Sequence, residues 1–377
     1  MIIYYILMTG IFLLYIISGI VVYSGLKRFH AETLSDLPPV SVIVAARNEE
    51  EHIANCINSL LALDYPKEKI ELIIVDDHST DNTCQIVQSL AANEPRLVPI
   101  SLGDYFENNS GKAGAIQFAV EKSRGEFIFV TDADCQVPKT WVKNLLSAFT
   151  PDMGLVGGVT LLDEPNEKMP IFGKIQSFDW LYLLTIATAT GYYGIPISWF
   201  GNNMAFRRQT FDDIDGFKNL RNTLVEDFAF ILKIHQSNKW NIRFIMHKDS
   251  LVKSSPLFKL RSYYNQRKRW ATAIHAVHPC AKVLMFTTVC AHIATLVSLF
   301  FFHIWMALAG LFIMVLMDFI VTWRSTGFLG RRDLLKYILY FKGYFYYFTL
   351  IFPVMLVFDR KIDWKDRHYP IYYKAQS

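Results

Sequence analysis

FVTDADCQ, residues 129–136, carries two carboxylates, Asp132 and Asp134, directly after the apolar run from Phe127 to Val130. A short apolar run of this kind predicts a buried strand, and residues two apart on a strand point to the same side. Two like charges side by side at the end of a buried strand are unfavourable unless a positive charge lies between them. The segment therefore predicts a strand that ends in a cation-binding pair.

The surrounding region, residues 38–275, alternates between apolar strands and amphipathic helices. Strands are predicted at 40–46, 71–75, 96–100 and 126–131, and helices at 49–63, 80–92, 112–123 and 139–149. Buried strands that alternate with helices predict a mostly parallel sheet with helices on both faces, which is an α/β fold. Ligands of such sheets bind at the carboxyl ends of the strands. The charged residues at those ends are Arg47, Asp76, Asp77, Asp132 and Asp134.

Ordinary helix capping explains only part of these strand ends. Asn48 and Glu49 suit the start of a helix, but capping gives no reason for Arg47 at the sheet edge. The segment VDDHSTDNT also opens a helix, and capping leaves Asp76 and Asp77 unexplained. Two adjacent carboxylates at a strand end suit hydrogen bonds to ribose hydroxyls or to a base N–H.

Two further features predict an anionic ligand and a metal ion. Lys112 lies at the start of a predicted helix, where a cation is mildly unfavourable unless an anion such as a diphosphate binds there. The alternative is a solvated lysine. Asp132 and Asp134 provide oxygen ligands at a strand end, which suit Mg²⁺ or Mn²⁺ bound together with substrate phosphates.

The composition of the chain indicates a membrane contribution. Of its 377 residues, 52% are hydrophobic and 19% are charged, below the roughly 25% charged residues of soluble proteins. The formal net charge is only +4, and no zinc-finger spacing or RNA-binding motif occurs, which argues against a nucleic-acid partner. The five cysteines form no C-x-x-C pair, which favours buried free thiols over disulfides or zinc.

The apolar excess lies at the two ends of the chain. Residues 1–26 carry no charge and predict a transmembrane helix. A cleaved signal peptide fits less well, because no basic segment precedes the run. Lys27 and Arg28 follow it, so the positive-inside rule places the next domain in the cytosol.

The second apolar region, residues 279–358, predicts two or three spans and is followed by a basic tail at 359–377. The run 337–358 is either a third span or an interfacial or re-entrant segment, and the side of the tail stays open. Residues 257–278 predict an amphipathic interfacial helix whose basic residues reach headgroups or water. The basic residues of the segment 257–278 are Lys259, Arg261 and Lys268. Residues 170–200 form either another interfacial helix or part of the core.

Six motifs in this order resemble those of membrane-integrated family 2 glycosyltransferases, which have a GT-A fold. They are VSVIVAARNEEEHIANCINSLL at 40–61, ELIIVDDHSTDNT at 71–83, GKAGA at 111–115, FVTDAD at 129–134, VED at 225–227 and QRKRW at 266–270. VED resembles the T-E-D motif, with Val225 where threonine is frequent, and QRKRW matches Q-x-x-R-W. This branch includes cellulose, hyaluronan and poly-N-acetylglucosamine synthases and ceramide glucosyltransferases. The resemblance implies a cytosolic GT-A catalytic domain at 38–256.

The resemblance also implies roles for the matching residues. Those that line the base, ribose and diphosphate of the donor would be Ala45, Arg47, Glu49, Asp77, Lys112, Asp132, Gln266 and Arg269. Asp134, assisted by Asp132, would hold Mg²⁺ or Mn²⁺. Asp227, in the motif with Glu226, would be the general base. Trp270 would form the floor of the acceptor site, with Asn202 and Asn203 in its wall.

The implied reaction is metal-dependent transfer of a sugar from a UDP-sugar with inversion. The acceptor is the hydroxyl of a membrane lipid, because the chain offers few spans for a channel. The alternative is a processive synthase that extends and translocates a β-linked glycan. A nucleotide-binding membrane scaffold is the non-enzymatic alternative. The predicted location is the inner or plasma membrane of a bacterium, with the catalytic domain in the cytosol and the oligomeric state open.

Overall fold

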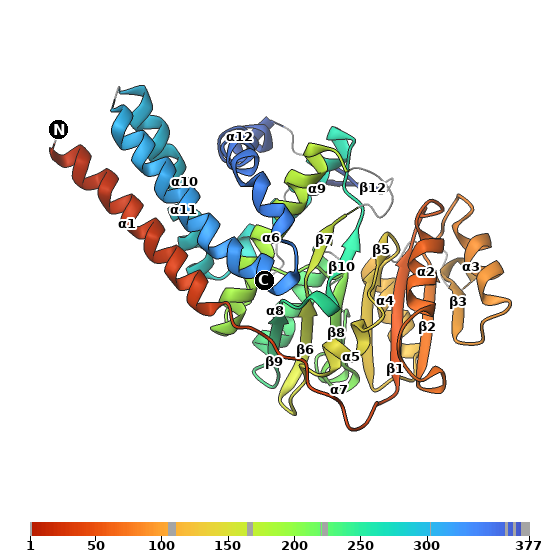
Figure 1. Ribbon diagram of the computed structural model, residues 1–377. Coiled ribbons are helices and arrows are strands. Elements are labelled where there is room, and N and C mark those ends of the chain that lie inside the picture. The colour runs from red at the N-terminus through yellow and green to blue at the C-terminus, as the bar shows by residue number, and fades with distance from the viewer. Residues whose placement is uncertain are drawn as a thin grey trace.

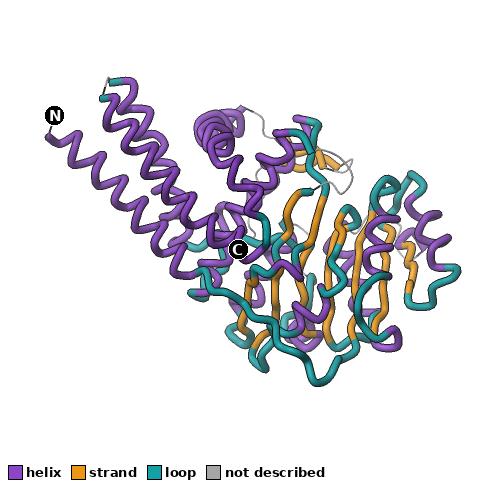
Figure 2. The backbone as a smooth tube through the Cα atoms, viewed as in Figure 1, coloured by secondary structure: helices purple, strands orange, loops and turns teal. Residues whose placement is uncertain are grey.

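The computed structural model describes residues 2–104, 111–163, 169–218, 220, 225–301, 303–358, 361–364 and 367–370. An α/β domain forms one part of the molecule. Long helices from the two ends of the chain extend away from it (Figures 1 and 2). Chain segments that are far apart in sequence thus form one helical region beside the sheet.

A seven-stranded sheet forms the centre of the α/β domain, in the order β3-β2-β1-β4-β8-β6-β9. Its strands are β1 Val40–Ala46, β2 Ile70–Asp76, β3 Leu97–Ser101, β4 Phe127–Asp132, β6 Met153–Gly158, β8 Asn203–Arg207 and β9 Asn241–Ile245. The strands β3, β2, β1 and β4 run parallel, as do β6 and β9, whereas β8 is antiparallel to β4 and β6. The predicted mostly parallel sheet is confirmed.

Shorter strands complete the sheets. A second sheet has the order β5-β10-β7, with β5 Cys135–Gln136, β10 Val252–Ser254 and β7 Thr160–Leu162. The strands β11 Lys361–Trp364 and β12 Arg367–Pro370 form an antiparallel hairpin near the C-terminus. The second sheet joins the segment after Asp134 to the segment that leads into the Q-x-x-R-W helix.

The helices of the α/β domain are α2 Ile53–Leu61, α3 Thr83–Ala91, α4 Gly111–Lys122, α5 Trp141–Leu146, α6 Ile171–Tyr192, α7 Arg208–Asp213, α8 Glu226–Gln236 and α9 Leu260–Ala271. The remaining long helices are α1 Ile2–Gly25, α10 Pro279–Phe300, α11 Ile304–Leu329 and α12 Ile338–Phe358. Short 3₁₀ helices occur at Lys67–Lys69, Leu102–Asp104, Lys248–Ser250, Thr272–Ala276 and Arg332–Tyr337.

Strand β1 shows why its apolar run is continuous. Ile43 packs into a cluster with residues of α4 and α6, and Val42 and Val44 pack into a second cluster with residues of α2 and α5. Successive side chains of a strand point to opposite faces, so a strand covered on both faces needs apolar residues throughout. The register pairs Ala46 with Asp76 and Ala45 with Asp132, which brings the two acidic strand ends to one edge.

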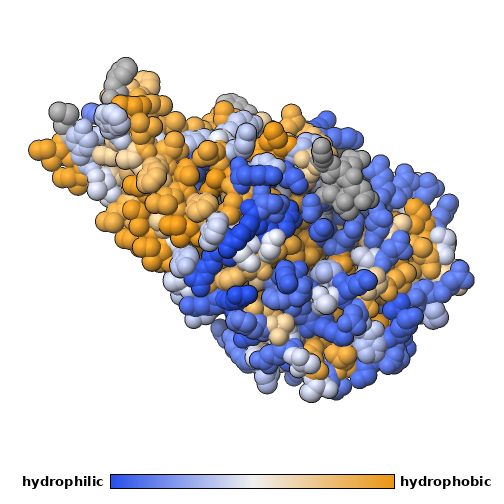
Figure 3. Space-filling view, in the orientation of Figure 1, coloured by the Kyte–Doolittle hydropathy of each residue, from blue (hydrophilic) through white to orange (hydrophobic). Residues whose placement is uncertain are grey.

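In the part of the chain that the structure describes, four helical segments are long and apolar enough to cross a membrane: α1, α10, α11 and Arg332–Met355, which contains most of α12. Helices α1, α10 and α11 lie side by side (Figure 1), and apolar side chains dominate their visible surface (Figure 3). Met8, Phe12 and Met314 fill the space between them. Phe12 lies so close to Gly310 that a Cβ there would be 2.1 Å from its ring. The C-terminal region therefore offers three candidate spans.

The burial of two features tests predictions made from the sequence: the segment 170–200 and the side chain of Lys268. The segment 170–200 contains α6, most of which is buried against α1, α11 and β9, so the middle of this helix belongs to the core. The Lys268 prediction was wrong. Its side chain is 2% exposed and lies over the ring of Tyr264, where it reaches neither headgroups nor water. Lys259 and Arg261 are exposed, as expected.

Candidate active site

The first part of the site lies at the carboxyl ends of β1 and β2. Arg47 donates a hydrogen bond from Nη1 to the Asp77 carbonyl oxygen at 3.2 Å, and Asp77 Oδ1 lies 3.1 Å from His78 Nδ1. Asn48 and His78 have φ angles of +53° and +61°, a left-handed conformation that costs non-glycine residues about 1–3 kcal/mol. The Asn48 N–H donates to Ser79 Oγ at 3.0 Å and so joins the two loops. The structure thus brings Arg47 and Asp77 together.

Asp76 offers a hydrogen-bond acceptor at the same edge. Its side chain is 6% exposed, and its Oδ2 accepts from the Ser79 N–H at 3.3 Å. Its Oδ1 is buried and has no hydrogen-bond partner among the described residues. A buried carboxylate oxygen without a partner is costly, so a ligand O–H or N–H would stabilise it. Nearby, Ala45 lies in β1, and the Glu49 N–H donates to Thr83 Oγ1 at 2.8 Å.

Lys112 and Asp132 form an ion pair at the end of β4. Both side chains are partly exposed, at 29% and 32%, so a ligand can reach them. Burial alone would lower the pKa of Lys112, but the carboxylates of Asp132, Glu226 and Asp227 outweigh it and raise the pKa above its usual value. Lys112 is therefore a permanent cation among three carboxylates.

Asp134 follows Asp132 by two residues and is partly exposed. Its Oδ2 accepts from Ser254 Oγ at 3.1 Å, and its Oδ1 accepts from Cys135 Sγ at 3.5 Å. Burial raises the pKa of the Cys135 thiol, and Asp134 and Asp132 raise it further, so this thiol stays protonated. Among the described residues, no group of three or more His, Cys, Asp or Glu side chains could hold an ion. Two carboxylates fit a cation that takes its other ligands from phosphates and water.

The predicted base lies at the start of α8. Asp227 Oδ2 accepts from the Gly201 N–H at 2.7 Å, and Oδ1 accepts from the Phe228 N–H at 2.8 Å. These two backbone donors, together with the positive end of the helix, fix the carboxylate and stabilise its charge. A Cβ on Gly201 would lie 2.6 Å from the Asp227 Cβ, so this close approach requires glycine.

Glu226 connects the base to the two cations of the site. Burial raises the pKa of Glu226 above its usual value, whereas the charges of Lys112 and Arg269 act in the opposite direction. The Glu226 carboxylate therefore interacts electrostatically with both Lys112 of α4 and Arg269 of α9. The structure brings together Lys112, Asp132, Glu226, Asp227 and Arg269, which come from four different elements.

The Q-x-x-R-W motif lies on α9, and its tryptophan packs against aromatic rings. The Trp270 ring stacks on Phe200 with centroids 5.0 Å apart and lies 5.8 Å from Trp180 of α6. Trp180 and Phe200 are 4.4 Å apart. Gln266 and Arg269 of the same helix are partly buried. We call Trp180, Phe200 and Trp270 the aromatic trio.

A buried ion pair lies under the aromatic trio. Arg267 Nη2 is 2.5 Å from Asp179 Oδ2, and the two side chains are 3% and 4% exposed. The Arg267 guanidinium also stacks on the Trp270 ring at 4.6 Å from its centroid. Burial alone would lower the pKa of Arg267, and Asp179 outweighs this effect and raises the pKa. The charged Arg267 guanidinium therefore packs against the Trp270 ring and helps to hold it in place.

The two asparagines predicted for the acceptor wall lie in the protein interior. Asn203 is fully buried. Its amide donates to the carbonyls of Val159 and Ser250, and its Oδ1 accepts from Trp141 Nε1 at 2.8 Å. The prediction for Asn203 was wrong, because these bonds use both N–H groups and the oxygen of its buried side-chain amide, which therefore does not face the acceptor substrate. Asn202 is 5% exposed and its Oδ1 accepts from Thr160.

Three residues of this region were not predicted from the sequence: Asp179, Trp180 and Arg267. Asp179 and Trp180 lie on α6, a segment without a motif, and Arg267 occupies a variable position of Q-x-x-R-W. A charged residue inside an aromatic stretch, as in FDWLY at 178–182, was the one signal available. Such a residue needs a partner when it is buried, but the sequence does not identify that partner.

Comparison with known proteins agrees with this geometry. The family model described as Glycosyl transferase family 2 matches residues 41–214. The beta-monoglucosyldiacylglycerol synthase of Nostoc sp. is 29% identical over 255 residues, which cover 67% of this chain and 52% of that protein. The poly-beta-1,6-N-acetyl-D-glucosamine synthase of Staphylococcus aureus is 26% identical over 253 residues, 65% of this chain and 56% of that protein. The chain thus spans about half the length of the curated relatives it matches.

A solved structure shares the fold. The mannosyltransferase PcManGT from Pyrobaculum calidifontis, in complex with GDP-Man and Mn²⁺, has a TM-score of 0.60 and 20% sequence identity. The match covers 95% of this chain and 98% of that one, so the similarity includes the long helices. Residues 41–214 of this chain therefore match the family 2 glycosyl transferase model, within a domain of GT-A fold that is joined to candidate membrane-spanning helices.

Proposed function

We propose that this protein transfers a single sugar from a UDP-sugar to the hydroxyl of a membrane lipid, with inversion at the anomeric carbon. The supporting observation is the course of α6. Trp180 of this helix contacts Trp270 of the site, and Tyr182, two residues on, donates a hydrogen bond to Asp318 of the candidate span α11. The wall of the proposed acceptor site is therefore continuous with the helices that would lie in the membrane.

The donor would bind along the edge formed by β1, β2 and β4. Asp76 and Asp77 would accept hydrogen bonds from the base and ribose, and Arg47 and Glu49 would line the same pocket. Lys112, Gln266 and Arg269 would contact the diphosphate, whose negative charge grows as it leaves. The fold neighbour contains GDP-Man, so a GDP-sugar is the donor to test against UDP-sugars.

The residues present fit a divalent cation bound together with the diphosphate. Asp134, with Asp132, would hold Mg²⁺ or Mn²⁺, the second of which accompanies GDP-Man in the fold neighbour. Such a cation neutralises negative charge on a leaving diphosphate. The Lys112 ammonium already lies against Asp132, so it would balance the second carboxylate of this pair.

Asp227 would accept the proton of the acceptor hydroxyl. Its two backbone hydrogen bonds hold the carboxylate in a fixed orientation, which a general base requires. Among the described residues at this edge, we assign no nucleophile that would bind the sugar covalently, and one base without a nucleophile gives direct displacement with inversion. The aromatic trio would contact the apolar face of the acceptor or sugar.

The lipid acceptor is favoured over a growing polysaccharide by the packing of the helical region. Phe12, Met8 and Met314 fill the space between α1, α10 and α11, so these three helices enclose no pore for a glycan. The site would lie at the inner face of a membrane. Lys27 follows α1 and lies over Tyr192 at the end of α6, 4.9 Å from the ring centroid, as a basic residue at a cytosolic interface does.

Membranes that contain the protein should be incubated with radiolabelled UDP-sugars, and the lipid extract separated by thin-layer chromatography. We expect one labelled glycolipid, whose formation stops when EDTA removes divalent cations. A high-molecular-weight polymer as the sole product would contradict the lipid acceptor. Unchanged transfer in EDTA would contradict the metal.

A further inference from the structure

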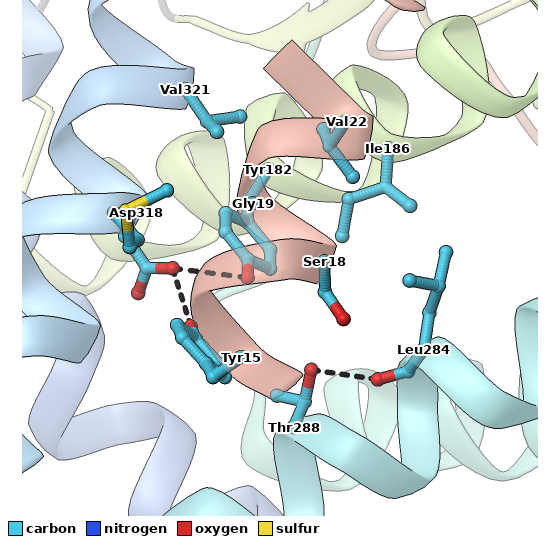
Figure 4. A pocket seen from close by; sticks show the side chains of 11 residues that line it. Tyr15, Ser18, Gly19, Val22, Tyr182, Ile186, Leu284, Thr288, Asp318 and Val321 are labelled. Atoms are coloured by element: carbon cyan, nitrogen blue, oxygen red, sulfur yellow. Dashed lines mark hydrogen bonds between the residues drawn. The ribbon is translucent and has the colours of Figure 1, made fainter. Parts of the chain in front are cut away.

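A small cavity with a mixed, mainly apolar lining lies between long helices, and none of its lining residues belongs to the sheet edge that forms the site (Figure 4). Its volume is about 40 Å³, and its lining comes from α1, α6, α10 and α11. The polar lining residues are Tyr15, Ser18, Tyr182, Thr288 and Asp318. The space suffices for one or two small polar groups such as a hydroxyl, and it is too small for a sugar or a phospholipid headgroup.

The charged residue at one end of the cavity is already neutralised. Asp318 Oδ1 accepts hydrogen bonds from Tyr15 at 2.6 Å and from Tyr182 at 3.2 Å. Its Oδ2 pairs with Lys342 of α12, and the two side chains are 3% and 5% exposed. Of the described residues that line the cavity, none is lysine or arginine. A phosphate group would therefore find no cation there.

The hydroxyl groups at the other end of the cavity already donate hydrogen bonds to carbonyl groups of their own helices. Ser18 donates to the Leu14 carbonyl at 2.8 Å, and Thr288 donates to the Leu284 carbonyl at 2.9 Å. Figure 4 shows Ser18 and Thr288 at one end of the space and Asp318 with the tyrosines at the other. A hydroxyl that donates to its own helix can still accept a hydrogen bond. The cavity therefore suits a ligand that donates a hydrogen bond.

The position along α1 restricts the ligand further. Ser18 lies seven residues before Gly25, the last residue of the helix, a distance of roughly 10 Å along the axis. Gly25 lies close against Ala189 of α6, and Lys27 marks the predicted interface. The cavity is thus below the headgroup layer, at a depth that a charged headgroup avoids.

We infer that this cavity binds the free hydroxyl of a neutral glycerolipid, such as a diacylglycerol. The hydroxyl donates to Thr288, beside Ser18, and the acyl chains lie along the exposed apolar surfaces of α1 and α10. This inference rests on the proposed function, because the ligand belongs to the class of lipid alcohols that would serve as acceptors. Tyr182, which lines the cavity, and Trp180 of the aromatic trio both lie on α6. A lipid bound in the cavity is therefore close to the α/β domain.

Photo-crosslinking of the full-length protein in phosphatidylcholine nanodiscs tests the inference. The probe is a diacylglycerol with a diazirine in one acyl chain, and the labelled peptides are identified by mass spectrometry. Unlabelled diacylglycerol should compete with the probe, whereas its 3-O-methyl ether, which cannot donate, should compete roughly three- to tenfold less well, the effect of one hydrogen bond. Thr288→Val should reduce labelling of α1 and α10 by a similar factor. Thr295→Val, on the same helix but outside the cavity lining, should leave it unchanged.

Equal competition by the methyl ether, equal labelling by a diazirine phosphatidylcholine, or unchanged labelling of Thr288→Val would overturn the inference. The competition arm uses the unaltered protein, so it remains decisive if a variant fails to fold. Crosslinking needs no sugar donor. Transfer to diacylglycerol without labelling of α1 and α10 would refute this cavity while the proposed function stands. Labelling without transfer would refute a diacylglycerol acceptor and leave the binding site intact.

Discussion

The ion pair between Asp179 and Arg267 gives a prediction in which stability and acceptor binding separate. Both side chains are almost fully buried, so Asp179→Asn leaves a buried guanidinium without its counter-ion. Breaking a buried pair by removing one partner costs about 3–5 kcal/mol of unfolding free energy. Replacing both partners with apolar residues of similar size is close to neutral, so the double variant Asp179→Leu/Arg267→Met should recover most of the stability.

Acceptor binding should not recover in the double variant. The guanidinium lies 4.6 Å from the Trp270 ring centroid, and a cation stacked on tryptophan contributes about 0.5–2 kcal/mol. Loss of this support should raise the acceptor KM roughly two- to thirtyfold and leave the donor KM unchanged. The assay combines thermal unfolding in detergent with initial rates at varied acceptor and at varied donor.

Two results would refute this reasoning. If Asp179→Asn unfolds at the same temperature as the unaltered protein, the pair is not the buried ion pair described above. If the stable double variant keeps the original acceptor KM, the pair has only a structural role and does not position Trp270.

Three further predictions follow from the same geometry. Asp227→Asn should abolish transfer and keep donor binding, measured by calorimetry, whereas the control Asp64→Asn, at a carboxylate that is 63% exposed and pairs with Lys143, should keep both; normal turnover in Asp227→Asn would remove the assigned base. Lys342→Met should lower the unfolding free energy by about 3–5 kcal/mol, because it leaves Asp318 buried without its partner, and adding Asp318→Asn should restore most of the loss; a single variant as stable as the unaltered protein would contradict this. Burial raises the pKa of Glu226 above its ordinary 4.5, so its contribution to stability is present below pH 4.5 and is lost as the pH rises through the raised value. Glu226→Gln should therefore gain melting temperature relative to the unaltered protein as the pH rises above 4.5, and a constant difference would argue against a buried glutamate with a raised pKa.

The strand ends were predictable because their signal is local. Apolar runs that end in Arg47, Asp76 and Asp132 fix both the strands and the edge where they meet, and the register confirms that edge. The sequence alone did not identify which positive charge accompanies the two carboxylates of FVTDADCQ. In the structure Lys112 pairs with Asp132, and a metal ion remains part of the proposal.

The remaining features depend on partners that are distant in sequence. Nothing near Lys268 indicates that Tyr264 and its surroundings bury it, and nothing near Asp179 indicates Arg267. The reversed direction of β8 was also hidden, since a short apolar strand reads the same in either direction. Asn203 was misassigned because a motif position suggests a ligand contact, whereas its hydrogen bonds to Val159 and Ser250 join β8 to the residue before β7 and to a 3₁₀ helix in the interior.

The most direct test of the central claim is the structure of the product. Purified protein in nanodiscs that contain diacylglycerol should be given a UDP-hexose, and the lipid extract analysed by mass spectrometry and by NMR of the anomeric proton. The account predicts a lipid heavier by one hexose, with an anomeric configuration opposite to that of the donor. A product that retains the donor configuration, or a polymer with no glycolipid, would contradict it.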